Sequence, residues 1–275
     1  MTPSPEVRAA LCGGELEVLG RLRAASNATF LCRVNSADVA VHCVYKPVAG
    51  EQPLWDFPDG TLAGRERAAY LISRRLGWNI VPYTVLRDGP AGIGMVQRWV
   101  EDPTDDPAGP ADAEGADLVD VVPAGRVPAG YLPVLDAYDY AGAEVTLIHA
   151  DDPRLYRMAV FDVLINNADR KGGHILRGAD GALYGVDHGV CLHVHDKLRT
   201  VLWGWAGKPV DEDTLASVAG LAADLDSDAD GLATALGEHL TAAEVDALRG
   251  RARTLLSDPV MPSADRHRPI PWPAF

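Results

Sequence analysis

Two short segments of the chain concentrate residue types that can act on phosphate esters. The first runs from Asn166 to His174 and contains Asp169, Lys171 and His174. The second, Val186-Asp187-His188-Gly189, adds another aspartate further along the chain. A carboxylate can act as a base, an ammonium group can neutralise phosphate charge, and carboxylate or imidazole groups can bind a divalent cation. Together the two segments hold the groups that phosphoryl transfer requires.

Each of these residues suits one role in that reaction. Phosphoryl transfer needs little covalent help, so a protein acts mainly by positioning groups and neutralising charge. We expect Asp169 to orient or deprotonate an acceptor hydroxyl and Lys171 to contact the γ-phosphate. Asp187 would hold the metal ion that bridges the β- and γ-phosphates, with His174 as the second protein ligand. Taken alone, the Asp169 to His174 segment would fit a plain loop equally well.

The upstream half of the chain supplies residues for binding the nucleotide. A β-forming run from Val39 to Tyr45 ends at Lys46, whose ammonium would contact the α- and β-phosphates. A predicted helix beginning near Thr61 carries Glu66 on its mostly apolar face, where an unpaired carboxylate is costly. We therefore predict that Lys46 pairs with Glu66. The alternative for Glu66 is a solvated helix charge beside two neighbouring arginines.

Two further predictions concern the adenine and phosphate groups. A strand predicted from Ile93 to Val100 ends where two lobes would meet. Backbone groups at this end would meet an adenine edge, namely those of Gln97, Trp99 and Val100. The segment from Leu22 to Thr29 has no glycine fingerprint, yet Ser26, Asn27 and their backbone amides would bind phosphate oxygens. A plain hairpin turn is the alternative interpretation of that segment.

Taken in order, these motifs resemble a known family of kinases. The segments that carry the likeness are Lys46, Arg65 to Ile72, Leu76-Gly77, Val81 to Thr84, Phe161 to Arg170, and Val186 to Gly189. They look like the kinase domain of the phosphatidylinositol 3- and 4-kinase superfamily, especially its type II 4-kinase branch and the small actinobacterial proteins related to it. This resemblance implies a two-lobed kinase fold with Lys46, Asp169 and Asp187 at ATP-binding and catalytic positions.

The sequence predicts an α+β, bilobal protein-kinase-like fold in one domain of 275 residues, which is long enough to bury a sizeable core. We expect an N-lobe over residues 15–100, with an antiparallel sheet plus one helix, and a mainly helical C-lobe over residues 118–275. Residues 101–117 are rich in proline, glycine and acid and should form a mobile loop. Three helices are predicted in the C-lobe, at Leu155–Ile165, Glu212–Leu225 and Thr241–Leu256.

Composition restricts the partners. The formal net charge of −14 disfavours nucleic acid and anionic membranes as docking surfaces. The chain shows no signal sequence and no run long enough to span a bilayer, and its four cysteines have no metal-ligand spacing. We therefore predict a cytoplasmic protein without stable membrane association. Basic residues near the motifs would help to hold ATP and a small acidic or polyol acceptor: Arg170, Lys171, Lys197, Arg199 and Lys208. Ordinary solvated charge is the alternative for the last three.

The metal and the reaction leave alternatives open. His174 stands where the related kinases carry asparagine, and imidazole prefers softer first-row ions, so ATP turnover should use Mn²⁺ at least as well as Mg²⁺. The acceptor could be a protein side chain, a polyol, a sugar or an antibiotic hydroxyl. A nucleotide-binding pseudokinase and an AMP-transferring enzyme are alternatives. A further alternative is a Zn²⁺ or Fe²⁺ enzyme built on the cluster from His188 to His195, with Cys191 and His193 between them.

Overall fold

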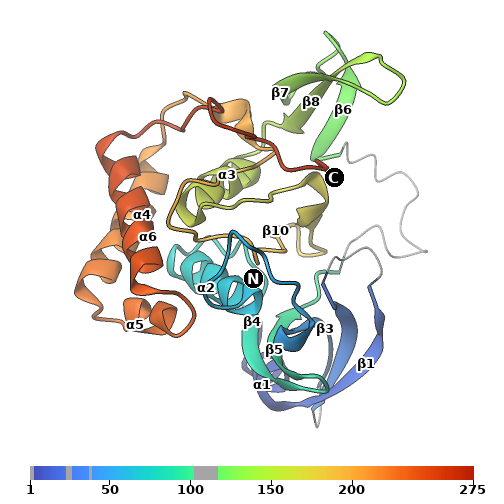
Figure 1. Cartoon of the computed structure of the whole chain (residues 1–275), viewed down its shortest axis with the longest axis vertical. Coiled ribbons are helices and arrows are strands. Elements are labelled where there is room, and N and C mark those ends of the chain that lie inside the picture. Colours follow the sequence, from blue (N-terminus) through green and yellow to red (C-terminus); the bar gives the residue numbers. More distant parts are fainter. Residues whose placement is uncertain (1–2, 23–26, 37–38, 102–116) are drawn as a thin grey trace.

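A computed structural model describes residues 3–22, 27–36, 39–101 and 117–275 of the chain. The fold is α+β, with an antiparallel sheet in the N-terminal part and helices gathered in the C-terminal part (Figure 1). The helices are α1 (Pro5–Gly13), α2 (Leu62–Arg75), α3 (Pro153–Ile165), α4 (Glu212–Ser227), α5 (Leu232–Gly237) and α6 (Ala242–Ser257), with short 3-10 turns at Val48–Gly50, Gly172–His174 and Trp203–Trp205. The strands are β1 (Glu15–Arg21), β2 (Phe30–Ser36), β3 (Val39–Pro47), β4 (Thr84–Gly89), β5 (Gly92–Arg98), β6 (Val119–Pro123), β7 (Tyr131–Tyr138), β8 (Glu144–Ala150), β9 (Ile175–Arg177) and β10 (Leu183–Gly185).

The N-terminal sheet carries Lys46 at the end of a central strand. Its order is β1-β2-β3-β5-β4, and every neighbouring pair is antiparallel. Cys32 and Cys43 lie opposite each other on β2 and β3 and are buried, as the sequence predicted. They belong to a small core that α1 closes with Ala10 and Leu11. The strand predicted to end at Lys46 is confirmed, and Pro47 is its last residue.

Helix α2 is held by both parts of the molecule. At its start the Thr61 side chain accepts the Gly64 N–H at 2.9 Å, while the Glu51 carboxylate accepts the N–H groups of the first two helical residues at 2.9 and 2.8 Å. Its apolar face belongs to the large core that α3, α4 and α6 also build. Arg65, 1% exposed, pairs with Glu244 of α6 at 2.5 Å. These contacts fix α2 against the C-terminal helices, beside which it lies in Figure 1.

A second sheet, which the sequence analysis did not predict, occupies residues 119–150. It has the order β6-β8-β7 and projects from the C-terminal part (Figure 1). The strands were not predicted because proline usually argues against a strand, and two of them contain one. Pro123 ends the edge strand β6, and Pro133 lies where the register of β7 against β8 shifts. Both are positions at which a sheet tolerates a residue without an N–H donor.

The remaining helices place the catalytic segment and the end of the chain. α3 buries Leu155, Phe161 and Leu164 and ends at Asn166, as expected for a helix that supports the loop after it. The predicted capping box between Thr241 and Glu244 is present at the start of α6. α5 was not predicted. After α6 the chain forms an extended strap along the C-terminal helices and ends near β6 (Figure 1). None of the helices in the described part of the chain has the length and apolar composition that crossing a bilayer requires.

The buried Arg65–Glu244 pair gives a stability prediction. Glu244→Ala leaves the Arg65 guanidinium buried without its carboxylate and also removes the capping box, so we expect a loss of about 3–5 kcal/mol in the free energy of unfolding. Urea denaturation followed by circular dichroism measures it. Asp246→Ala on the same helix is the control. Its side chain is 68% exposed, so removing its ion pair should change stability by about 1 kcal/mol or less. Equal losses in the two variants would contradict this assignment.

Candidate active site

Lys46 is the point at which three distant segments meet. Its Nζ lies 2.6 Å from Glu66 Oε1 on α2 and 2.8 Å from Asp187 Oδ1, which follows β10. Burial would lower the pKa of Lys46, but the two carboxylates outweigh it and raise the pKa overall. The ammonium therefore stays charged. The ion pair predicted between Lys46 and Glu66 is present, and Asp187 completes it.

Asp187 has an unusual backbone. Its φ is 61°, in the left-handed region that side chains other than glycine rarely adopt. The neighbouring amides hold it there: the Val186 N–H donates to the His174 carbonyl at 3.0 Å, and the His188 N–H donates to Glu66 Oε2 at 3.3 Å. The Lys46 ammonium holds the pKa of the Asp187 carboxyl well below its usual range. The result is an ionised carboxylate in a fixed orientation.

His174 faces Asp187 with one ring nitrogen. Its Nδ1 lies 2.9 Å from the Asp169 carbonyl, so Nδ1 carries the proton and donates it. Its Nε2 lies 3.5 Å from Asp187 Oδ2. Burial lowers the pKa of His174 to about 4, so the ring is neutral at pH 7 and Nε2 offers a lone pair. A lone pair and a carboxylate that face each other, with the imidazole oriented by a backbone carbonyl, suit a divalent cation.

Asp169 and Lys171 form an ion pair beside this group. The distance from Asp169 Oδ2 to Lys171 Nζ is 3.3 Å, and both side chains are partly exposed. Burial raises the pKa of Asp169, and the neighbouring Lys171 opposes that shift. The Asp169 N–H donates to Asn167 Oδ1 at 3.1 Å, which fixes the turn. A carboxylate with a raised pKa that opens toward solvent can accept a proton from a hydroxyl group.

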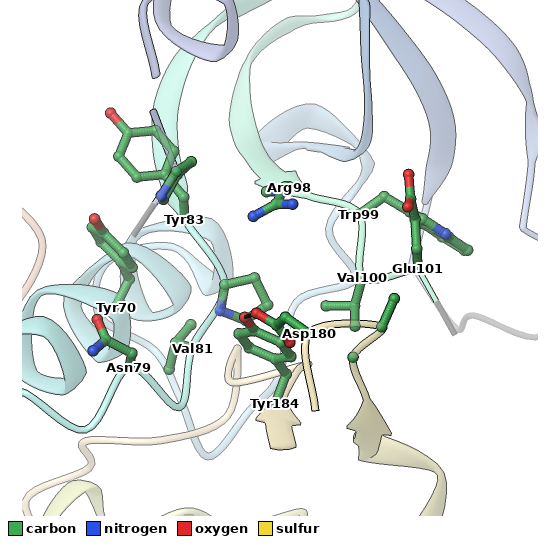
Figure 2. A pocket seen from close by; sticks show the side chains of 14 residues that line it. Tyr70, Asn79, Val81, Tyr83, Arg98, Trp99, Val100, Glu101, Asp180 and Tyr184 are labelled. Atoms are coloured by element: carbon green, nitrogen blue, oxygen red, sulfur yellow. Dashed lines mark hydrogen bonds between the residues drawn. The ribbon is translucent and has the colours of Figure 1, made fainter. Parts of the chain in front are cut away.

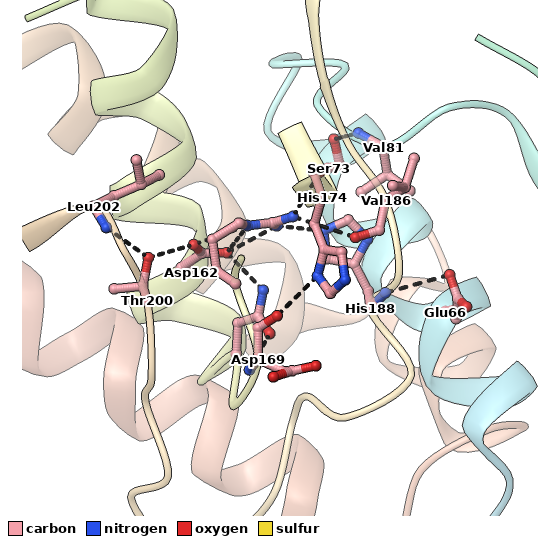
Figure 3. A network of polar contacts seen from close by, with 12 residues as sticks. Glu66, Ser73, Val81, Asp162, Asp169, His174, Val186, His188, Thr200 and Leu202 are labelled. Atoms are coloured by element: carbon pink, nitrogen blue, oxygen red, sulfur yellow. Dashed lines mark hydrogen bonds and ion pairs between the residues drawn. The ribbon is translucent and has the colours of Figure 1, made fainter. Parts of the chain in front are cut away.

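Arg170 lies at the centre of a buried network that sequence reasoning missed. Figure 3 shows this network, with the partners Asp162, His174, Val186 and His188 labelled. Its side chain is fully buried, and its Nε and Nη2 donate to Asp162 of α3 at distances from 2.9 to 3.2 Å. Nη1 donates to the carbonyls of His174 and Val186, each at 3.3 Å. Asp162 also accepts the Thr200 hydroxyl at 3.1 Å. One guanidinium thus joins the segment of Asp169 to the segment of Asp187.

Two neighbours of Arg170 fit its side chain closely. A Cβ on Gly185 would lie 3.0 Å from both terminal guanidinium nitrogens, so a larger residue there would require the Arg170 side chain to shift by a few tenths of an ångström. His188 Nε2 lies 2.7 Å from Nη2 and accepts from it, because a guanidinium only donates. The proton of His188 is therefore on Nδ1, which has no hydrogen-bond partner within the described residues. In the sequence, the feature that could have predicted this network is Asp162, a charged residue within the otherwise apolar run of α3.

Most of the predicted nucleotide contacts line one cavity of about 340 Å³, whereas Glu66 lines a neighbouring cavity. The lining of the first cavity includes Asn27, Lys46, Gln97, Trp99, Val100, His174 and Asp187. The Trp99 N–H already donates to the His42 carbonyl at 3.0 Å, and the Gln97 side chain donates to Thr84 Oγ1 at 2.9 Å. Within the described residues, Val100 alone of the three predicted adenine-binding residues has its N–H outside any hydrogen bond. Ser26 and residues 102–116 of the acidic loop lie outside the described residues.

Another cavity, of about 280 Å³, also reaches the segment after β5 (Figure 2). It shares Arg98, Trp99 and Val100 with the nucleotide cavity and is otherwise lined mainly by Tyr70, Asn79, Tyr83, Asp180 and Tyr184. Among the described residues that line it, none is predicted to act in catalysis or to bind metal. The described residues predicted to act in catalysis or to bind metal therefore lie outside this cavity, whereas Lys46, His174 and Asp187 line the larger one.

The structure contradicts the zinc or iron alternative. His188 points inward to Arg170, while Cys191 Sγ is 3.9 Å from the Arg65 carbonyl. His193 packs against the Phe57 ring at 5.2 Å, and His195 is exposed. Nowhere in the part of the chain that the structure describes do three histidine, cysteine or acidic side chains gather as a metal site would need. The histidines are close in sequence but turn in different directions.

Comparison with known proteins agrees with the fold. Over its whole length the chain is 65% identical to the Mycobacterium tuberculosis protein Rv2133c, 98% of which is covered. No protein-family model matches the chain. The solved structure of the Golgi casein kinase superposes with a TM-score of 0.53 over 92% of this chain and 73% of its own, at 13% identity. That of the Helicobacter pylori proinflammatory kinase CtkA gives 0.47 over 91% and 94%, at 11% identity. The fold is kinase-like.

The end of the strap contacts the catalytic segment, which gives a prediction. The Gly172 N–H donates to the Ala274 carbonyl at 2.8 Å, and a Cβ on Gly172 would lie 2.8 Å from the Phe275 ring. Gly172→Ala should therefore displace the residues on either side of it and destabilise the fold by about 1–3 kcal/mol. Thermal unfolding and metal-dependent binding of a fluorescent ATP analogue measure both effects.

Gly173→Ala is the matched control for the stability measurement, because a Cβ there meets nothing within 4 Å; it is not a control for nucleotide binding, because Gly173 lines the cavity. Adding Phe275→Ala to Gly172→Ala removes the clash and should restore part of the lost stability and affinity. If alanine at the two glycine positions has the same effect, the strap does not constrain this segment.

Proposed function

This chain belongs to the family of the Mycobacterium tuberculosis protein Rv2133c, and we propose that it is an ATP-dependent kinase that transfers phosphate to a hydroxyl acceptor. The kinase-like fold supports the reaction class. One observation carries the proposal: Lys46 Nζ is within 2.8 Å of both Glu66 and Asp187, and His174 Nε2 faces the same aspartate at 3.5 Å. A phosphate-binding ammonium and two metal-binding donors thereby share one wall of a cavity.

The residues of the chain would divide the work. Val100 would bind the adenine edge, and Lys46 and Asn27 would contact phosphates. A divalent cation held by Asp187 and His174 would supply charge neutralisation on the β- and γ-phosphates. Asp169 would accept the proton of the acceptor hydroxyl as that oxygen bonds to the γ-phosphorus. The bond from the γ-phosphorus to the bridging oxygen would break at the same time and leave ADP. Lys171 would stabilise charge on the transferred group.

The finer assignments belong to this proposal as well. Membership of the phosphatidylinositol 3-/4-kinase-like superfamily is supported by the order of Lys46, Glu66, Asp169 and Asp187 along the chain. The presence of Asp169 and Lys171 together with Lys46 and Asp187 favours a catalyst over a nucleotide-binding pseudokinase, because a protein that only binds needs no base. Transfer of AMP differs in the phosphorus attacked. Parallel reactions with γ-labelled and α-labelled ATP and cell extract distinguish it from phosphate transfer. The cytoplasmic location stays a prediction.

Removing the two aspartates should separate binding from turnover. Asp187→Ala removes a metal ligand and the partner of Lys46, so metal-dependent nucleotide binding should be lost. Asp169→Ala keeps the metal ligand Asp187 and its ion pair with Lys46, so this variant should bind nucleotide normally. Its turnover should fall by about 10²–10⁴-fold, because the base is lost. Calorimetric titration and release of labelled phosphate measure the two quantities. Asp213→Ala, on the exposed first turn of α4, is the control. Parental activity in both site variants would place the site elsewhere.

The imidazole at position 174 should set the metal preference. We expect the parent chain to hydrolyse ATP with Mn²⁺ at least as fast as with Mg²⁺, because an imidazole nitrogen suits the softer ion. His174→Asn replaces it with an oxygen donor, so the ratio of the Mg²⁺ rate to the Mn²⁺ rate should rise. Rates and nucleotide affinities at matched metal concentrations give this ratio. A clear Mg²⁺ preference in the parent, or an unchanged ratio in the variant, would contradict the role of His174.

A further inference from the structure

A third cavity, distinct from the two described above, adjoins the proposed nucleotide cavity and is lined by Asp169. Its volume is about 340 Å³, near the lower end of the ~300–1,000 Å³ typical of small-ligand pockets. It shares Asn27, Lys46 and Asp187 with the nucleotide cavity, and Asp169 and Arg199 also line it. If the proposed kinase reaction is correct, the acceptor hydroxyl must reach Asp169 from this cavity.

Residues 51–57, in the N-terminal part, form one wall of this cavity, and side-chain contacts hold both ends of this segment. At one end, the Glu51 carboxylate accepts two N–H groups at the start of α2. At the other, Asp56 pairs with Lys197 of the C-terminal part at 3.0 Å, and the Phe57 and His193 rings lie 5.2 Å apart. The wall thus ties the two parts together across the acceptor side of the site, which favours a small acceptor over the surface of a folded protein.

The carboxylates that line the cavity all have partners. Glu66 and Asp187 share Lys46, Asp169 pairs with Lys171, Asp56 pairs with Lys197, and Glu51 caps α2. Lys46 is likewise satisfied. Each lining carboxylate therefore already has a partner other than Arg199, which acts on Asp169 only through a longer-range attraction that lowers the pKa of that carboxyl.

Arg199 is the exception. Its backbone is held on both sides, because its N–H donates to the Asn167 carbonyl at 2.8 Å and its carbonyl accepts the Arg170 N–H at 3.0 Å. Its half-buried side chain lines the cavity, yet within the described residues the guanidinium forms no hydrogen bond or ion pair. The other basic residues predicted near the site differ: Arg170 and Lys197 are paired, and Lys208 is exposed and lines neither cavity.

We propose that the acceptor is a small, water-soluble hydroxyl compound that bears a phosphate or carboxylate group, and that Arg199 binds this group. A guanidinium presents two parallel N–H donors that match a carboxylate or a phosphate, and the attraction is stronger in a partly enclosed cavity than in water. The hydroxyl group would then lie toward Asp169, which shares the cavity with Arg199. This inference rests on the proposed kinase function and adds the chemical class of its substrate.

The test compares soluble compounds that differ by one anionic group. Calorimetry with the whole chain, Mn²⁺ and a non-hydrolysable ATP analogue measures binding of myo-inositol against myo-inositol 1-phosphate, glucose against glucose 6-phosphate, and glycerol against glycerate. In at least one pair we expect the anionic compound to bind about tenfold more tightly or better, as one charge-assisted contact provides. Arg199→Gln should abolish this difference and Arg199→Lys should keep part of it. Lys208→Gln, which removes an exposed cation, should leave it unchanged.

Several results would overturn the inference. These are equal binding within every pair, no binding of any anionic compound, and an Arg199→Gln variant that still discriminates. If Arg199 acts only on Asp169, Arg199→Gln will hydrolyse ATP more slowly in the absence of acceptor, but the ratio of affinities for anionic and neutral compounds will stay unchanged. That outcome also overturns the inference. So does phosphate transfer to phosphatidylinositol in phosphatidylcholine vesicles when no soluble anionic compound binds.

Nucleotide binding, measured separately, distinguishes this failure from failure of the proposed function. A chain that neither binds the ATP analogue nor hydrolyses ATP refutes the kinase proposal. A chain that binds and hydrolyses ATP but treats neutral and anionic compounds alike refutes only the role of Arg199 and the anionic acceptor.

Discussion

A guanidinium group keeps its positive charge when it is buried, so a buried arginine must find partners for its donors. Two such arginines organise this molecule. Arg170 is satisfied by Asp162, by His188 and by two backbone carbonyls, and these partners belong to α3 and to the segments around Asp187. The terminal guanidinium nitrogens of Arg65 donate to Glu244 and to the carbonyls of Asp59 and Cys191, while its buried Nε has no partner among the described residues. Because each set of partners comes from distant segments, meeting the demand of two buried charges brings the catalytic groups together.

The need to keep these buried charges paired also restricts how the site can move. In kinase-like sites the ion pair between a strand lysine and a helix glutamate must be in place, and its helix is often the mobile element. Here the helix that carries Glu66 has its apolar face in the large C-terminal core and its Arg65 paired with α6. Withdrawing α2 would expose that face and separate a buried ion pair, at a cost of several kcal/mol. Packing therefore holds Glu66 next to Lys46. The loop before α2 is held in a similar way, by contacts of Glu51 with α2 and of Asp56 with Lys197.

Local patterns predicted the elements whose signals lie close together along the chain. The helix that became α2 combined apolar periodicity with a predicted start near Thr61, and the helix that became α6 began with a capping box. The helix that became α3 was a dense apolar run, and the strand before Lys46 was an unbroken run of β-forming residues. The sheet over residues 119–150 was missed because proline usually argues against a strand. Its prolines occupy a strand end and a register shift, and such positions are defined only once the strands pair.

The sequence by itself determined which chemical groups are present and in what order: an ammonium, a helix carboxylate, and two aspartates for which we propose the roles of base and metal ligand. The types and spacing of Lys46, Glu66, Asp169 and Asp187 were enough for that. Apart from the Lys46–Glu66 pair, which the sequence predicted, only the tertiary structure decided which cation meets which carboxylate. Arg170, Lys197 and Arg199 look alike in sequence, yet one is buried in a network, one closes a wall and one faces a cavity. The physical reason is that the direction and burial of a side chain depend on segments distant in sequence, whose packing no local pattern encodes.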